Sequence, residues 1–263
     1  MNELSVFGVV IRETLVKDSD KIITVLTGDL GKITVLAKGV KGIKSKNSAG
    51  VQLFCYSEFE LIEKNGRYTL KTAVLKHGFF GMRNDILAFS LASYILDITN
   101  AVTNENADET ETLRLLLNTL HVLSEKKELL LWHIKGAFEL KLMQVCGYMP
   151  HLEYCPICAC DIEEDKACYF SLSEGCVVCS ECHKNAFLSG NEVPNTISVS
   201  YPVIQAMRFI CQSQVNRFLS FRLDTSLKSE FSLVTEKYLL YRAERSFETL
   251  KIYKNMVNTV GEN

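Results

Sequence analysis

The chain has 263 residues, a formal net charge of −2 and a hydrophobic content of 47%, which is typical of a globular protein with one large domain or two modest ones and excludes a disordered chain. The N-terminus carries no basic segment followed by a cleavage site, and no apolar run reaches the roughly 18–20 residues that span a bilayer. We therefore expect a soluble, cytoplasmic protein.

The small net charge conceals an asymmetry along the chain. Residues 1–80 carry a net charge of +4 and residues 195–263 carry +3, whereas residues 81–150 carry −3 and residues 151–194 carry −6. A positive field attracts a polyanion, so contact with nucleic acid is expected at the ends of the chain and not in the acidic segment.

The first 80 residues are predicted to form β structure. Two β-branched runs flank the sequence G-D-L-G, which is a hairpin signal. The five predicted strands lie within residues 6–12, 21–27, 32–38, 51–62 and 67–75. Five strands without an intervening helix predict a small closed barrel, and we expect an OB-fold.

A lysine-rich loop follows the third predicted strand. Glycine and serine separate its lysines, and no acidic residue occurs between Lys32 and Gln52. Lysine is a mobile point charge and glycine permits close backbone approach, so the loop suits a sugar-phosphate backbone. A solubilising loop over the barrel mouth is the alternative. The predicted DNA-binding residues, two of them on neighbouring strands, are Lys38, Lys41, Lys44, Lys46, Arg12 and Lys32.

Several aromatic residues of the same region are open to two interpretations. Each can stack on an unpaired base, and each also fits the apolar core of a barrel, which is the more usual place for such a side chain. These residues are Phe54, Tyr56, Phe59, Tyr68, Phe79 and Phe80.

After residue 80 the hydrophobic period becomes helical. Asn84-Asp85 and the pair Asp108/Glu111 are capping signals for the first two helices, and a third is predicted over residues 126–146. A further helix starts near Pro202, and a long last helix is predicted from Asp224 or Ser226 to about Val257. We predict an α+β multidomain protein, with an OB-fold domain at residues 1–80 and an α-helical bundle domain at 81–263.

Seven of the ten cysteines lie between Cys155 and Cys182. The sequence reads C-P-I-C, twenty further residues, and C-S-E-C, and two such knuckles supply the four thiolates of a closed zinc site. A reducing cytoplasm favours metal binding over disulfides. We predict a structural Zn²⁺ site in an insert at residues 151–194, with Cys155, Cys158, Cys179 and Cys182 as ligands. Cys176 and Cys160 remain competing ligands, because Cys176-x-x-Cys179 is itself a knuckle.

A catalytic alternative rests on His151-Leu152-Glu153. With Cys179 and Cys182 it resembles a zinc deaminase pattern, in which a His and two Cys bind the metal and Glu moves the proton. That interpretation leaves Cys155 and Cys158 without a role, and Val178 stands where the pattern has Pro. No nucleotide-binding loop, H-E-x-x-H or G-x-S-x-G motif occurs, and we expect no catalytic residues.

Four stretches resemble the bacterial RecO family of recombination mediators. They are G-V-V-I-R, then I-I-T-V-L-T-G-D-L-G-K-I-T-V-L-A-K-G-V-K-G-I-K-S, the cysteine segment C-P-I-C with Y-F-S-L-S-E-G-C-V-V-C-S-E-C, and Y-L-L-Y-R-A-E-R-S-F-E-T-L-K. The resemblance supports the four ligands named above, because Cys176 falls where the family usually has Gly. Tyr241-Arg242-Ala243-Glu244 departs from the family, which favours His-Leu-Gly after the Tyr.

The resemblance implies a set of functions and partners. It implies binding of single- and double-stranded DNA, annealing of complementary strands, and DNA repair through RecR, the acidic tail of single-stranded DNA-binding protein, and loading of RecA. It also implies association with the nucleoid and none with a membrane. The near-neutral net charge of −2 supports an alternative, a zinc-stabilised protein–protein adaptor that does not bind DNA directly.

Overall fold

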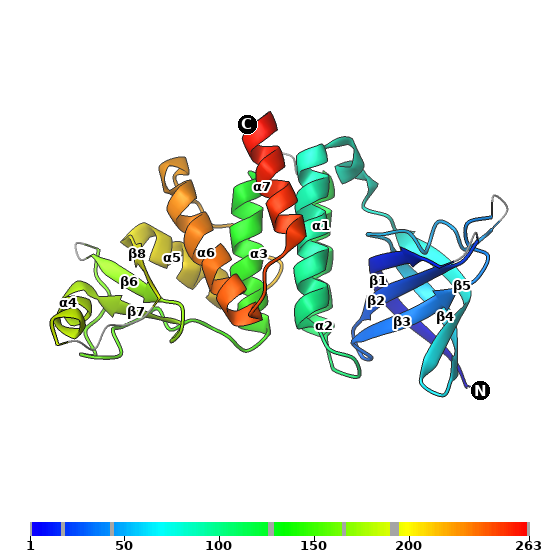
Figure 1. Ribbon diagram of the computed structural model, residues 1–263, viewed down its shortest axis with the longest axis horizontal. Coiled ribbons are helices and arrows are strands. Elements are labelled where there is room, and N and C mark those ends of the chain that lie inside the picture. Colours follow the sequence, from blue (N-terminus) through cyan, green and yellow to red (C-terminus); the bar gives the residue numbers. More distant parts are fainter. Residues whose placement is uncertain are drawn as a thin grey trace. The chain divides into compact units, whose positions relative to one another are not determined.

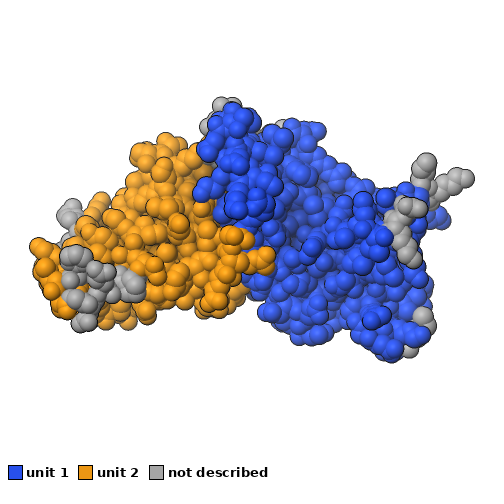
Figure 2. Space-filling model, viewed as in Figure 1, with its two compact units in different colours: residues 1–129, 247–263 blue, residues 130–246 orange. Residues whose placement is uncertain are grey.

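The computed structural model describes residues 2–16, 19–42, 45–125, 129–164, 167–189 and 195–261, without the side chain of Phe187. Figure 1 shows the elements of the chain, and Figure 2 shows its two compact units, residues 1–129 with 247–263 and residues 130–246. This division follows spatial contacts and does not test the predicted limits at residues 80 and 151–194, which stay predictions.

Unit 1 begins with a closed five-stranded barrel. Its strands are hydrogen-bonded in the order β1-β2-β3-β5-β4, and β4 pairs with β1 to close the barrel (Figure 1). Strands β3 and β5 are parallel, and the other pairs are antiparallel. The strands are β1 (Asn2–Leu15), β2 (Lys21–Thr27), β3 (Lys32–Ala37), β4 (Tyr56–Lys64) and β5 (Arg67–His77). The barrel confirms the predicted OB-like architecture.

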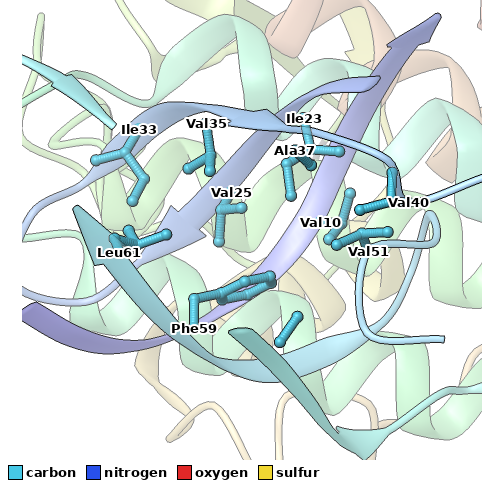
Figure 3. Close-up of a cluster of buried hydrophobic side chains, with 11 residues drawn as sticks. Val10, Ile23, Val25, Ile33, Val35, Ala37, Val40, Val51, Phe59 and Leu61 are labelled. Atoms are coloured by element: carbon cyan, nitrogen blue, oxygen red, sulfur yellow. The ribbon is translucent and has the colours of Figure 1, made fainter. Parts of the chain in front are cut away.

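Alternate residues of the strands fill the barrel, because successive side chains of a strand point to opposite faces. Figure 3 shows this core, with Val25 of β2, Val35 of β3 and Phe59 of β4 pointing into it. All three side chains are completely buried. Each such side chain contributes roughly 1.5–3 kcal/mol of transfer free energy, so the barrel holds together by apolar burial.

Three helices complete unit 1: α1 (Ile86–Val102), α2 (Thr110–Glu125) and α7 (Glu248–Val260). The short 3₁₀ turn Phe80–Asn84 leads into α1. As predicted, the carboxylate of Asp85 caps α1, accepting from the N–H groups of Leu87 and Ala88 at 2.9 and 3.1 Å. Helix α7 packs beside α1 (Figure 1), where the Thr249 hydroxyl donates to Asp97 at 2.8 Å.

Unit 2 contains the helices α3 (Leu131–Val145), α5 (Tyr201–Gln212) and α6 (Lys228–Ala243). The 3₁₀ turn Thr225–Leu227 leads directly into α6. Helix α3 packs against α5 and α6. A three-stranded sheet in the order β7-β6-β8, with α4 (Ser180–Leu188), carries the cysteine segment. Its strands are β6 (Cys168–Ser171), β7 (Cys176–Cys179) and β8 (Thr196–Val199).

A buried ion network joins α3 to α6. The Lys135 ammonium lies 2.7 Å from Glu139 and 2.9 Å from Glu236, and the Thr235 hydroxyl donates to the second Glu139 oxygen at 2.9 Å. Such a group of charges is tolerated in the interior only when each member is paired and hydrogen-bonded. The network therefore links α3 to α6 through paired charges inside unit 2.

Two helix predictions were wrong. The third helix starts at Leu131, so residues 129 and 130 are not helical as predicted, because Leu130 has extended dihedrals; residues 126–128 of that prediction lie outside the described residues. The predicted long last helix is two helices, since Glu244 takes a left-handed conformation (φ 51°) and Phe247 is extended. The physical reason is tertiary: Phe247 is buried against Tyr94 of α1, and this burial outweighs the helical periodicity of residues 240–257.

None of the described helices is both long and apolar enough to span a bilayer.

Candidate nucleic-acid interface and metal centre

The predicted basic loop is an exposed turn after β3, which we call the lysine turn (residues 38–42, 45 and 46). The side chains of Lys38, Lys41 and Lys46 are exposed. Within the described part of the chain, none of the three is in an ion pair. Lys44 was also predicted to contact DNA and lies outside the described residues. The turn therefore presents three ammonium groups that are not engaged in ion pairs with the described carboxylates.

The backbone of the lysine turn is anchored to the barrel. Gly39 has a positive φ of 64°, which glycine adopts without steric cost, and its N–H donates to the Asp20 carboxylate at 2.8 Å. Val40 is buried in the barrel core, and the N–H of Lys41 donates to the Ser19 carbonyl at 3.2 Å. The backbone is fixed while the lysine side chains extend into solvent.

The two strand residues in the predicted set differ from the turn. Arg12 is exposed on β1, at an irregularity in its pairing with β2. Lys32 starts β3, about 17 Å along the strand from its other end, and its ammonium donates to the Asn100 carbonyl at 2.7 Å. Lys32 therefore ties the barrel to α1, a role that its charge alone does not reveal.

The aromatic residues divide between core and surface. Phe54, Phe59 and Phe79 are buried and belong to the packed interior. Phe80 is 43% exposed, and Phe7, which the sequence analysis did not single out, is 47% exposed. The alternation of β1 was the signal for Phe7, because Phe7 shares its face with the exposed Glu3 and Ser5, whereas Leu4 and Val6 on the opposite face pack against the core.

In unit 2 the structure brings together the four predicted cysteines. The sulfur atoms of Cys155, Cys158, Cys179 and Cys182 all lie within 4.8 Å of one another. The segment around Cys155 forms a tight turn in which Ala159 N–H donates to the Cys155 carbonyl at 2.8 Å, with Ala159 at φ 56°. Cys179 ends β7, and Cys182 lies in the first turn of α4.

The spacing of these thiols suits a tetrahedral metal ion. Zinc–sulfur bonds of about 2.3 Å in a tetrahedron place two sulfurs about 3.8 Å apart, and the Cys158 and Cys179 sulfurs are 3.7 Å apart. Hydrogen bonds with the backbone and thiol of Cys160, and with Cys182, lower the pKa of Cys158 to about 6. The surroundings of Cys158 thus favour the thiolate form that binds metal, whereas burial and hydrogen bonds to the neighbouring thiols raise the pKa of Cys182. The four cysteines can hold a metal ion.

Cys160 is a further thiol next to this group. Its sulfur lies 3.2 Å from that of Cys158, and the hydrogen bond between the two thiols raises the pKa of Cys160 to about 12. Cys176, the other competing ligand, starts β7 opposite Ser171 and is not one of the four clustered cysteines. Cys55 and Cys211 are buried away from this group, and burial raises their pKa values to about 11 and 12.

The His151–Glu153 segment is held by contacts of its own. The backbone of His151 bonds to Gly175 and Val177, and its ring packs against Tyr154. The Glu153 carboxylate accepts from Gln212 at 3.0 Å and lies 3.5 Å from Arg208. Both partners of this carboxylate lie on α5, and His151 is not one of the residues clustered with Cys179 and Cys182. This arrangement favours a closed four-thiol site over the deaminase interpretation.

Comparison with known proteins gives one family for both units. The family models for the N-terminal and C-terminal parts of recombination protein O match residues 1–79 and 83–251. A DNA repair protein RecO from Acetivibrio thermocellus is 32% identical over 97% of this chain and 98% of the relative. Its counterpart from Alkaliphilus metalliredigens is 30% identical over 95% of this chain and 98% of its own. The chain belongs to the RecO family of DNA repair proteins.

Proposed function

We propose that this protein is a DNA-binding recombination mediator that holds and anneals DNA strands during repair. The observation that carries the proposal is the lysine turn on an OB-like barrel, in a chain of the RecO family. OB-folds bind single strands through a basic groove and aromatic stacking. Lys38, Lys41, Lys44 and Lys46, with Arg12, contact phosphates, and the exposed Phe7 and Phe80 offer stacking surfaces. Lys32, held by Asn100, contributes charge from the far end of β3.

The mechanism is electrostatic and requires no nucleotide hydrolysis. Each lysine that neutralises a phosphate releases counterions, which drives binding and makes it dependent on salt. Two complementary strands held on positive surfaces repel each other less than they do in solution, so they can pair. We therefore assign no catalytic residue.

The four clustered cysteines hold a structural Zn²⁺ ion in this proposal. All four ligand positions are filled by thiolates, so the site has no open position for water or substrate. The ion cross-links the turn at Cys155, the end of β7 and the start of α4, which otherwise share a small apolar core. Its segment has a net charge of −6, and we assign it no contact with DNA.

The proposed partners follow from family membership. With RecR, the protein helps load RecA on single strands coated with single-stranded DNA-binding protein, whose acidic tail it binds. This activity takes place in the cytoplasm, at the nucleoid.

The test is binding and annealing by the purified, metal-containing protein without ATP. Fluorescence anisotropy with single- and double-stranded oligonucleotides of about 40 nucleotides should show binding that weakens steeply between about 50 and 200 mM salt. Mixing complementary strands with the protein should accelerate duplex formation. Failure to bind either form at low salt would contradict the proposal and support the alternative, a protein–protein adaptor without direct DNA contact.

A further inference from the structure

Unit 2 carries an open hollow that the functions discussed above do not use. We call it the Arg217 hollow; its volume is about 790 Å³, and Phe209, Ser213, Gln214, Arg217 and Ser220 line it. It lies where α5 ends and the chain turns toward α6. None of its lining residues is acidic, and the sequence contains no Asp or Glu from Val193 to Leu223.

The backbone around the hollow is firmly held. The N–H of Arg217 donates to the Gln214 carbonyl, and that of Ser220 donates to the Arg217 carbonyl, both at 2.9 Å. Phe218 is fully buried, and Phe221 stacks on the ring of His133 at 3.8 Å. This anchoring keeps the positions between the buried residues facing solvent and gives the hollow a defined shape.

The polar groups of the hollow have no described use. Among the residues that the structure describes, the side chains of Ser213, Gln214, Arg217 and Ser220 make no hydrogen bond or ion pair. Arg217 is exposed, and Phe209 is 39% exposed. By contrast, nearby Arg208 is engaged with the Leu152 carbonyl and Glu153.

We propose that the Arg217 hollow is a second nucleic-acid site, which takes a phosphodiester and an adjoining unpaired base of a DNA single strand. A guanidinium binds phosphate through two parallel N–H groups, and hydroxyl and amide groups are common phosphate donors. The exposed ring of Phe209 supplies a face on which an unpaired base stacks. This inference rests on the proposed DNA-binding function and adds a site on the other compact unit.

An acidic peptide shares the negative charge but fits this hollow less well. A peptide tail with acidic and hydrophobic residues needs an apolar pocket for its hydrophobic side chains. The residues that line the Arg217 hollow include one aromatic residue and no aliphatic one. A nucleotide instead matches one ring, one guanidinium and several neutral donors. A strand bound here, with another on the barrel, gives annealing two separate holding points.

The test uses full-length, metal-loaded protein and a labelled oligo(dT) of about 20 nucleotides. Arg217→Gln should reduce the slope of log K against log salt by about 0.7, the value for one phosphate contact on a single strand. Phe209→Leu should weaken binding about five-fold, the low end of measured stacking contributions. Arg222→Gln removes an exposed arginine close in sequence that does not line the hollow, and it is the matched control.

The outcomes separate this inference from the proposed function. If wild type binds DNA and Arg217→Gln behaves as Arg222→Gln does, the hollow is not a DNA site while the proposed function stands. If Arg217→Gln instead weakens only the binding of an acidic peptide, the occupant is a protein and the inference is wrong. No DNA binding by wild type would overturn both. Photocrosslinking of 4-thiothymidine DNA to the peptide around Arg217 would support the inference independently of any folding defect.

Discussion

The barrel and the cysteine segment achieve a defined fold in different ways. Eleven buried side chains from all five strands and the adjoining turn form the barrel core, and the charges lie outside it. In the cysteine segment, Phe170 is the one large aromatic among the described buried hydrophobic residues, and four of the others are cysteines. The barrel is stabilised by apolar burial, whereas the proposed function gives the cysteine segment a metal cross-link.

Their surfaces differ as well. Residues 1–80 carry +4, with three exposed lysines on one anchored turn, and residues 151–194 carry −6. Lysine, which makes residues 1–80 suitable for binding a polyanion, is nearly absent from residues 151–194. In the proposed function, the most conspicuous chemical motif of the chain stabilises the fold, while DNA binding belongs to an inconspicuous turn between strands.

Removing a metal ligand should have the largest effect. Structural zinc contributes on the order of 10 kcal/mol to the folding of small zinc domains. We expect Cys155→Ser to abolish bound zinc, and to remove amide-exchange protection from β6 and β7 while β1–β5 stay protected. Metal analysis and hydrogen exchange measure both quantities.

Cys160→Ser is the matched control for that variant. It removes a thiol 3.2 Å from Cys158 that lies outside the four-sulfur group, so it should retain metal and protection. Retention of both by Cys155→Ser would show that the segment does not depend on a metal cross-link.

Truncating the barrel core should have the next largest effect. Phe59 is completely buried, and Phe59→Ala should lower the free energy of unfolding by about 3–5 kcal/mol through lost transfer energy and a residual cavity. Urea titration followed by amide exchange in β1–β5 measures it. Phe7→Ala, at an exposed position of the same barrel, should cost about 0.5 kcal/mol. Equal costs would mean that the barrel does not depend on this core.

A smaller effect is expected from a buried histidine in unit 2. Burial lowers the pKa of His133, whose ring nitrogen donates to the Leu219 carbonyl at 3.3 Å. The unfolded chain therefore binds a proton more readily than the folded one. The stability contributed by the neutral ring is complete above about pH 6.5 and is lost as the pH falls below it, by at most about 1.4 kcal/mol per pH unit.

Urea unfolding followed by the fluorescence of Trp132, the single tryptophan, measures this dependence at about pH 7.5 and 5.5. His133→Gln should flatten it, because glutamine can still donate to Leu219 but does not titrate. His121→Gln, at an exposed histidine of α2, should leave it unchanged. If the free energy of unfolding of His133→Gln depended on pH as steeply as that of the wild type, the dependence would not come from His133.

Local patterns predicted much of the fold. β-branched runs and turn residues indicated the barrel, Asp85 indicated the start of α1, and the spacing of two knuckles indicated the four clustered cysteines. These features depend on neighbours in sequence. The turn at Glu244 could not be predicted in this way, because burial of Phe247 against a distant helix decides it.

Long-range contacts also decided the roles of single side chains. The charge of Lys32 predicted a DNA contact, but its ammonium is hydrogen-bonded to Asn100, 68 residues away in the sequence. Cys160 lies close to Cys158 because Ala159, which stands between them, adopts a left-handed conformation. The sequence does not predict this conformation, because alanine rarely adopts it. The Arg217 hollow could not be predicted from the sequence, because its shape depends on the burial of Phe218 and Phe221.

The most direct test of the account compares two triple variants of the barrel. One changes Lys38, Lys41 and Lys46 of the lysine turn to Ala; the other changes Lys64, Lys71 and Lys76 of β4 and β5, of which two are in ion pairs at 2.8 Å. Both remove the same charge. The slope of log K against log salt for single-strand binding should fall in magnitude by about 2 in the first variant and by much less in the second. Equal slopes in the two variants would contradict the lysine turn as the DNA contact.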